Sequence, residues 1–150
     1  SLRRQRQMCI RDRGISAEIQ TSDFAAFPKR IYTDRDWDLA IDRYGSTLDP
    51  TVGTQRFYHS RSFKVGVPFT NPARYENPEA DALWDAAAIE VNPQKRREIF
   101  SKLQAVLLRD IPILPQVVAT RNITSRTSVQ GNAPFATGSF DSFAQAWLAA

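Results

Sequence analysis

Two Asn-Pro pairs, at residues 77–78 and 92–93, constrain the fold of this chain more than any other feature. An Asn side chain caps the first backbone N–H groups of a helix and proline fits the first helical position, so each pair predicts a helix start. Apolar residues then recur at helical spacing. They are Ala80, Leu83, Trp84 and Ala87 after the first pair, and Ile99, Phe100, Leu103, Val106 and Leu107 after the second. The sequence therefore predicts a hairpin of two amphipathic helices, with the charged residues 95–98 on its outer face.

The period of the apolar residues changes before this hairpin. Residues 15–20 and 37–42 alternate between apolar and polar side chains, which predicts two strands. Between them, residues 24–31 place apolar side chains on one helical face, and Pro28 is expected to kink this helix or to begin it. Strand, helix and strand predict a βαβ unit with parallel strands and a right-handed crossover. Ligands of open α/β sheets bind beyond the carboxyl ends of the strands, which directs attention to residues 43–49.

The regions on either side of the hairpin complete the predicted topology. Residues 51–75 contain glycines, prolines and scattered aromatic residues, which is typical of an irregular connection with one short helix. After the hairpin, residues 111–120 are predicted to form a buried strand and residues 123–130 an exposed edge strand. The expected fold class is α/β, with a βαβ unit, a helical hairpin and returning strands.

The formal net charge of +4 comes from one end of the chain. Residues 1–13 (SLRRQRQMCIRDR) hold five basic and one acidic residue, and the rest of the chain holds 15 of each. This segment also contains Cys9, the single cysteine, and lacks the apolar stretch of a secretory signal. We interpret residues 1–13 as a non-native leader rather than as a basic arm, so the basic composition predicts no nucleic-acid partner. The sequence contains no stretch of about 18 apolar residues, so no membrane span is predicted.

Five strings of the sequence carry a resemblance to a known family. They are GISAEIQTSDFAAF, DWDLAI, TLDPTVGTQRFY, RYENPEADALWDAAAIEVNPQKRREIFSKLQAVLLRDIPILP and FAQAWLAA. Together they resemble the C-terminal part of family 5 extracellular solute-binding proteins, a family that includes oligopeptide and dipeptide receptors of ABC importers. The strongest element of the resemblance is a spaced set: Tyr75, Asn77, Pro78, Glu79, Asp81, Arg96 or Arg97, Asp110 and Pro112.

The resemblance implies part of a periplasmic-binding-protein type II fold, in which two lobes close over a ligand by a hinge motion. Residues 14–74 would then belong to the second, ligand-binding lobe, and residues 75–150 would be a C-terminal segment that returns to the first lobe. If the lobes are interleaved in this way, the Leu103 face of the hairpin should be left uncovered in this chain.

The function implied is that of the substrate-binding component of an ABC transporter, which captures a small polar solute and delivers it to permease subunits. The solute would be a peptide, an opine or a sugar-like compound, with no cofactor and no enzymatic reaction. The implied location is the periplasm, or the extracellular side of the membrane with an anchor in a Gram-positive source. Two alternatives stay open: an α/β hydrolase that uses Asp36 and Asp38, and a ligand-sensing receptor of the same fold that contacts no transporter.

The candidate ligand-binding residues are Tyr44, Gly45, Ser46, Thr47 and Gln116. The first four follow the predicted strand 37–42, where peptide-binding relatives carry an aromatic residue and an aspartate that binds the amino terminus of the ligand. Ser46 stands near the aspartate position, and its hydroxyl cannot form the charge-assisted bond that an ammonium group needs. The resemblance therefore leaves room for a sugar, an opine-like compound or a modified peptide.

Several residues have a structural interpretation beside the functional one. Asp49, ahead of a proline, is interpreted as a turn or helix cap. Gln116 is either a ligand-facing residue, as the resemblance implies, or a hydrogen-bonded core amide. Trp37 and Trp84 are interpreted as core residues, and His59 lacks a partner at metal-ligand spacing.

Overall fold

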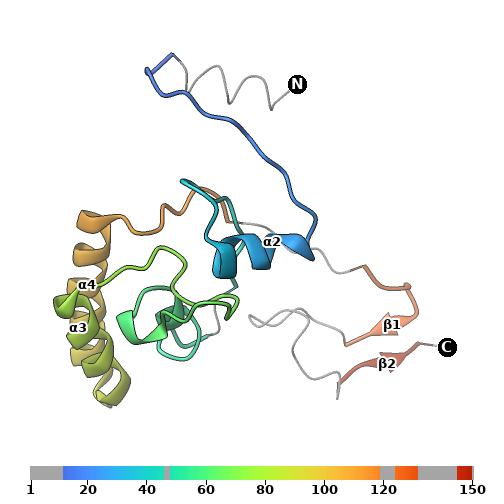
Figure 1. Cartoon of the computed structure of the whole chain (residues 1–150). Helices are drawn as coiled ribbons and strands as arrows, with labels where there is room; N and C mark the ends of the chain where they lie inside the picture. The colour runs from blue at the N-terminus through green and yellow to red at the C-terminus, as the bar shows by residue number, and fades with distance from the viewer. Residues whose placement is uncertain (1–11, 46–47, 119–123, 132–144, 150) are drawn as a thin grey trace.

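The computed structural model describes residues 12–45, 48–118, 124–131 and 145–149 of the 150-residue chain, whose regular structure is mostly helical (Figure 1). In chain order the elements are helix α2 (Ala26–Pro28), the π-helical turn η1 (Lys29–Asp34), the 3₁₀ turns η2 (Thr54–Phe57) and η3 (Ser60–Ser62), helices α3 (Pro78–Ile89) and α4 (Pro93–Asp110), and strands β1 (Val129–Gln130) and β2 (Trp147–Leu148). The two short strands pair antiparallel, with Val129 opposite Leu148 and Gln130 opposite Trp147.

The predicted α/β fold class is wrong, because the described residues contain no βαβ unit and no parallel sheet. Residues 15–20 and 37–42 run without a strand ladder, and Leu39 and Ile41 are 90% and 79% exposed. An alternating sequence decides which side chains share a face, but a strand also needs a neighbour for its backbone hydrogen bonds. The expected periplasmic-binding-protein type II architecture depends on such units, so the described residues do not form it.

The strands predicted after the hairpin are wrong over most of their length. Residues 111–118 form a mostly exposed segment without strand pairing, and residues 119–123 lie outside the described residues. Only the end of the second predicted strand is paired within the described ranges, as β1 with β2.

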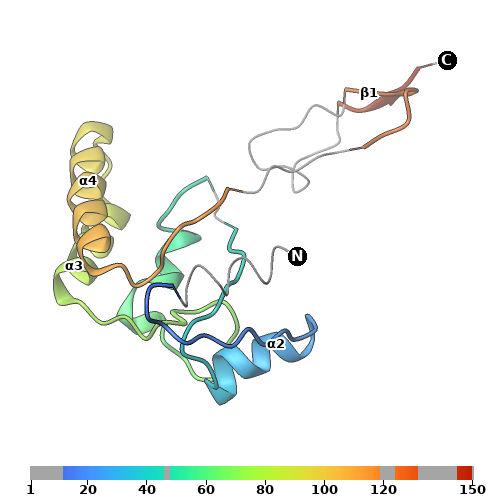
Figure 2. The same cartoon turned by 90° about the horizontal axis from the view of Figure 1, so that it is seen from above.

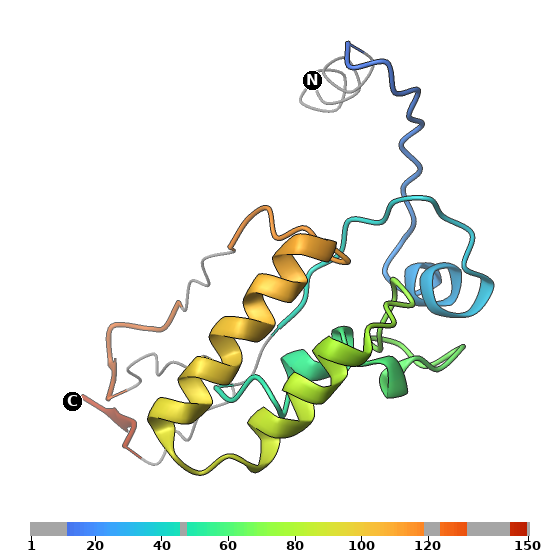
Figure 3. The ribbon, with the colours of Figure 1, turned by 90° about the vertical axis from the view of Figure 1, so that its left-hand side faces the viewer.

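Both predicted helix starts and the hairpin itself are confirmed (Figure 3). The Asn77 side chain accepts hydrogen bonds from the backbone N–H groups of Glu79 and Ala80, at 2.9 and 3.3 Å. Asn92 caps α4 in the same way, with bonds of 2.9 and 3.1 Å. Helix α4 ends at Asp110, because the next residue, Ile111, has a positive φ of 46° that takes the backbone out of the helical path.

The two helices pack against each other around Trp84 and Leu103, which are 2% and 1% exposed. The other residues in or against this core are Tyr58, Tyr75, Ala80, Leu83, Phe100, Val106 and Leu107. The Trp84 ring meets Phe100 edge-on, with centroids 6.1 Å apart, and stacks on Tyr58 at 6.2 Å. The core interpretation of Trp84 is confirmed. The expectation of an uncovered Leu103 face is wrong, because the hairpin and the segment before it cover this face.

The helix predicted over residues 24–31 forms as the short α2 followed by η1. The backbone hydrogen bonding widens from the α to the π pattern after Pro28, where the sequence predicts an interruption. Ile31 is buried, and the indole Nε1 of Trp37 donates to the Ile31 carbonyl at 3.1 Å. Figure 2 shows the segment of η2 and η3 between α2 and the hairpin.

Two predictions about chain organisation stay predictions. Residues 1–11 of the expected non-native leader lie outside the described residues. The contacts within the chain do not test the division into lobe segments 14–74 and 75–150.

Candidate functional site

The Tyr44 loop, residues 43–49, is the first part of the candidate site, and aromatic packing fixes its N-terminal end. The half-buried Tyr44 ring lies against Phe57, with centroids 4.3 Å apart. Its hydroxyl lies 3.4 Å from the hydroxyl of buried Tyr32, which in turn donates to Oδ2 of Asp42 at 3.4 Å. We call Tyr32, Asp42, Tyr44 and Phe57 the tyrosine cluster.

Burial keeps the hydroxyls of the tyrosine cluster neutral. Removal from water raises the pKa of Tyr44 far above its ordinary value, and the neighbouring hydroxyl of Tyr32 raises it further. Burial likewise raises the pKa of Tyr32. Tyr44 can therefore offer a ligand an aromatic ring and a neutral hydroxyl, but no charge.

The structure describes Tyr44, Gly45 and Gln116 of the five predicted ligand-binding residues, while Ser46 and Thr47 lie outside the described residues. Gly45 is exposed beside Tyr44. Gln116 is exposed on the segment after α4, which contradicts its interpretation as a core amide. No hydrogen bond between described residues joins Gln116 to Tyr44. A ligand-binding role for the five residues stays a prediction.

Asp49 fixes the C-terminal end of the Tyr44 loop. Its Oδ1 accepts hydrogen bonds from the backbone N–H and the hydroxyl of Thr51, at 2.9 and 2.7 Å, which closes a turn before η2. The interpretation of Asp49 as a turn residue is confirmed. Both carboxylate oxygens also accept hydrogen bonds from Nη2 of Arg96, at 2.8 and 2.9 Å. We call the Asp49–Arg96 pair the loop clasp.

Arg96 joins three segments of the chain through one guanidinium group. Besides Asp49, Nη2 contacts the Thr51 hydroxyl at 3.2 Å, and Nε donates to the Ala87 carbonyl near the end of α3 at 2.8 Å. The guanidinium also lies over the Phe100 ring, 5.3 Å from its centroid. Hydrogen bonds from Arg96, and secondarily from Thr51, lower the pKa of Asp49 to about 2.

The prediction that residues 95–98 all face outward is wrong for Arg96, which is half-buried. The sequence does contain a signal for the clasp. Arg96 precedes Phe100 and Leu103 by four and seven positions, so it continues the apolar face of α4. A cation on that face predicts an anionic partner, but its spacing alone does not identify Asp49.

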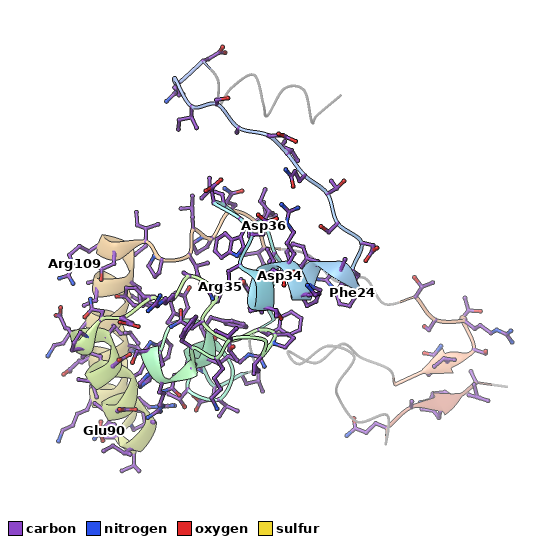
Figure 4. The ribbon with its side chains drawn as sticks, in the orientation of Figure 1. Phe24, Asp34, Arg35, Asp36, Glu90 and Arg109 are labelled. Carbon is purple, nitrogen blue, oxygen red and sulfur yellow. The ribbon has the colours of Figure 1, made fainter. Side chains whose placement is uncertain are left out.

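Residues that carry the family resemblance meet at the other end of the hairpin. The Tyr75 hydroxyl and Nδ2 of Asn77 both donate to Oδ2 of Asp110, at 2.7 and 2.6 Å. Arg109 donates to Oδ1 of Asp110 at 2.9 Å and to Glu79 at 3.2 Å. Figure 4 shows Arg109 at this end of α4. We call these five residues the hairpin-end cluster.

The hydrogen bonds of the hairpin-end cluster shift the pKa values of Asp110 and Tyr75. Bonds from Arg109, and then from Tyr75, lower the pKa of Asp110 to about 2. Burial, and then the Asp110 carboxylate, raises the pKa of Tyr75 to about 12. At neutral pH Asp110 is therefore an ionised acceptor and Tyr75 a neutral donor.

His59 is 4% exposed and lies between two acidic residues of α3. Its Nδ1 is 3.2 Å from the Asp81 carboxylate, and its Nε2 is 3.3 Å from that of Asp85. The Ser60 N–H donates to Asp81 at 3.0 Å, and Arg61 pairs with Asp85 at 2.9 Å. This network ties η3 to α3. Within the described ranges, no group of three or more His, Cys, Asp or Glu side chains is placed to hold a metal ion.

The acids of the hydrolase alternative lie in solvent. Asp36 pairs with Arg30 at 3.1 Å and its side chain is 76% exposed; Figure 4 shows it near Asp34 and Arg35. Asp38 is exposed as well. A catalytic acid–base pair flanks the bond that is broken, in a pocket from which water is excluded. The setting of these acids gives the hydrolase alternative no support.

A shallow hollow of about 330 Å³ lies beside the loop clasp, lined by Pro93, Arg96, Arg97 and Phe100. Because the Arg96 guanidinium binds Asp49, Arg97 is the exposed cation at this hollow.

Comparison with known proteins gives no relative: no family model, curated protein or solved structure matches the chain. None of the helices among the described residues combines the length and apolar character that a membrane span requires. The functional conclusion therefore depends on the residues themselves.

Proposed function

We propose that this chain is part of the substrate-binding component of an ABC importer, which captures a small polar solute and delivers it to membrane permease subunits. The proposed location is the periplasm, or the extracellular face of the membrane in a Gram-positive source. The described residues contain no βαβ unit, and the proposal does not require one. Its support is the resemblance to family 5 solute-binding proteins together with the contacts among the residues that carry it.

One observation supports the proposal most: separate strings of the resemblance contact each other. Asp49 in TLDPT binds Arg96 in NPQKRR, and Asp110 in LLRDIP binds Tyr75 and Asn77 in RYENP. A hydrogen bond is lost when either partner is absent, so the residues of each pair depend on each other. The proposal therefore relies on residues of the resemblance that contact each other in the folded chain.

The Tyr44 loop is the proposed contact region for the solute. It is anchored at one end by the tyrosine cluster and at the other by the loop clasp, and binding residues are concentrated on loops that a scaffold positions. Tyr44 offers a ring and a neutral hydroxyl, and Ser46 supplies another hydroxyl. These groups suit a polar solute without the primary ammonium group of a peptide amino terminus, such as a blocked peptide, a sugar or an opine-like compound.

A ligand panel tests this proposal on the full-length gene product. The panel contains the dipeptide alanyl-phenylalanine, its N-acetylated amide, maltose and octopine. We expect at least one compound to raise the Tm, because a ligand at 100 times its Kd adds about 2.7 kcal/mol to the free energy of unfolding. No rise with any of the four compounds would count against a solute receptor.

Two variants make this measurement specific for the loop. Tyr44→Ala removes the ring of the Tyr44 loop and should abolish the ligand-induced rise in Tm. Tyr75→Phe removes a hydrogen bond at the opposite end of the hairpin, so it should lower the Tm but keep the ligand-induced rise. A rise that survives in Tyr44→Ala would place the solute elsewhere.

A further inference from the structure

We propose that Arg35, Phe63 and Arg74 form a binding site for a small dicarboxylate, and we call these three residues the paired-arginine site. They come from three segments: the end of η1, the segment after η3 and the segment before α3. The guanidinium carbon of Arg35 lies 4.9 Å from the centroid of the Phe63 ring, and that of Arg74 lies 5.5 Å from the same centroid. The two cations are therefore no farther apart than the sum of these distances.

Arg35 is a half-buried cation whose partners are neutral. Its Nη2 donates to the Pro72 carbonyl at 2.8 Å, and its guanidinium lies over the phenyl ring. Asp34 and Asp36 lie near Arg35 (Figure 4), but both form ion pairs with basic residues of η1. Among the described residues, no carboxylate pairs with Arg35. Because a half-buried charge without a counter-charge is costly, this position favours the approach of an anion.

Arg74 is the more accessible of the two cations. Its side chain is 67% exposed, and its ion pair with Glu76 is long, with 3.9 Å between Nε and Oε1. A charge-assisted hydrogen bond between such groups is shorter by about 1 Å. The Glu76 side chain is itself 65% exposed, so it can turn into water. A ligand carboxylate can therefore replace Glu76 at Arg74 without breaking a short hydrogen bond.

The backbone holds both arginines in place before any ligand binds. Arg35 and Arg74 have φ values of 53° and 52°, which are uncommon for residues other than glycine. The backbone N–H of Arg35 bonds to the Arg30 carbonyl, and that of Arg74 bonds to the Asn71 carbonyl at 3.2 Å. Asn71 is fully buried, and its side chain accepts a hydrogen bond from the N–H of Tyr75 at 2.9 Å. A site that is ordered in advance loses less entropy on binding.

The two guanidinium groups define the class of the ligand. Each planar guanidinium presents parallel N–H groups that match the two oxygens of one carboxylate. A ligand with a single carboxylate can satisfy one arginine in this way, whereas a dicarboxylate can satisfy both. None of the three residues belongs to the Tyr44 loop, so this site goes beyond the proposed function and does not depend on it.

Calorimetric titration of the full-length gene product with succinate tests the site. We expect one succinate per chain, with a Kd on the order of 1 mM at low ionic strength. Acetate, which has one carboxylate, should bind at least about tenfold more weakly, and uncharged succinamide should not bind. The absence of saturable succinate binding, or equal binding of succinamide, would overturn the proposal.

Two charge variants separate the site from a general attraction of anions. Arg74→Gln should weaken the Kd for succinate roughly tenfold, and its Tm should stay near that of the wild type because Arg74 is exposed. Arg97→Gln removes the same charge from an exposed position on α4 and should leave the Kd unchanged. Equal effects of the two variants would overturn a local site.

Two further variants test the geometry of the site. Glu76→Gln removes the carboxylate that competes for Arg74 and should tighten succinate binding severalfold, a gain that loss of folding cannot imitate. Phe63→Leu keeps both charges but removes the ring beneath them, and should weaken binding by roughly threefold. Affinity that is unchanged in both Glu76→Gln and Phe63→Leu would overturn the paired-arginine site. Tyr44→Ala should bind succinate like the wild type, and loss of succinate binding in that variant would also overturn an independent site.

Discussion

Asp110 accepts hydrogen bonds from Tyr75, Asn77 and Arg109, and so connects the end of α4 to the start of α3. Asp49 connects the Tyr44 loop to α4 through Arg96. Each of these carboxylates has donors from distant positions, and in each case the donors lower its pKa to about 2. Both carboxylates therefore close contacts between segments that are far apart in the sequence.

Acid should destabilise the folded chain through these two carboxylates. Their folded pKa of about 2 lies below the ordinary value of 3.8, so the unfolded state binds more protons between these values. Their contribution is fully present above the unfolded pKa and is lost as the pH falls toward 2. Urea unfolding between about pH 6 and pH 2 should show this loss, and Asp110→Asn should make it smaller.

Asp38→Asn is the matched control for this pH dependence. Asp38 is exposed on the segment after η1, so its replacement should leave the pH dependence as in the wild type. An identical loss of stability on acidification in the wild type and in Asp110→Asn would contradict a stabilising role for the Asp110 carboxylate.

At the scale of elements, the sequence predicts those elements that depend on interactions between residues close together in the chain. The Asn77 and Asn92 caps and the apolar stripes act within a few residues, so both helices and their hairpin follow from the sequence. The predicted strands depend on distant partners, and the described parts of residues 15–20, 37–42 and 111–120 find none. Within the candidate site, Tyr44 and the turn at Asp49 are predictable, but the bond from Asp49 to Arg96 spans 47 positions and is not.

The caps give a prediction for the hairpin. Asn92→Ala removes the acceptor for two N–H groups of α4 and should lower the free energy of unfolding by about 1 kcal/mol. Gln94→Ala, an exposed position in the same turn, should change it by less than about 0.5 kcal/mol. Urea unfolding followed by circular dichroism measures both, and equal effects would show that the Asn92 cap does not stabilise α4.

At the scale of the whole molecule, the described residues divide into a packed part and an exposed part. The hairpin and the segment of η2 and η3 share a core around Trp84. Residues 37–41 and 111–118 instead leave runs of apolar side chains in solvent, among them Leu39, Ile41 and Val118. Single exposed apolar residues are ordinary, but these runs occur where the sequence pattern predicts burial in a sheet. The α/β prediction fails in these two segments because the side chains expected to be buried in a sheet are exposed.

A calorimetric titration of the full-length gene product with the four panel compounds tests the central claim most directly. For a solute-binding component we predict saturable binding of one solute per chain to the wild type and to Tyr75→Phe, and no binding to Tyr44→Ala. The absence of binding heat for all four compounds, or equal binding to the wild type and Tyr44→Ala, would contradict a solute site at the Tyr44 loop.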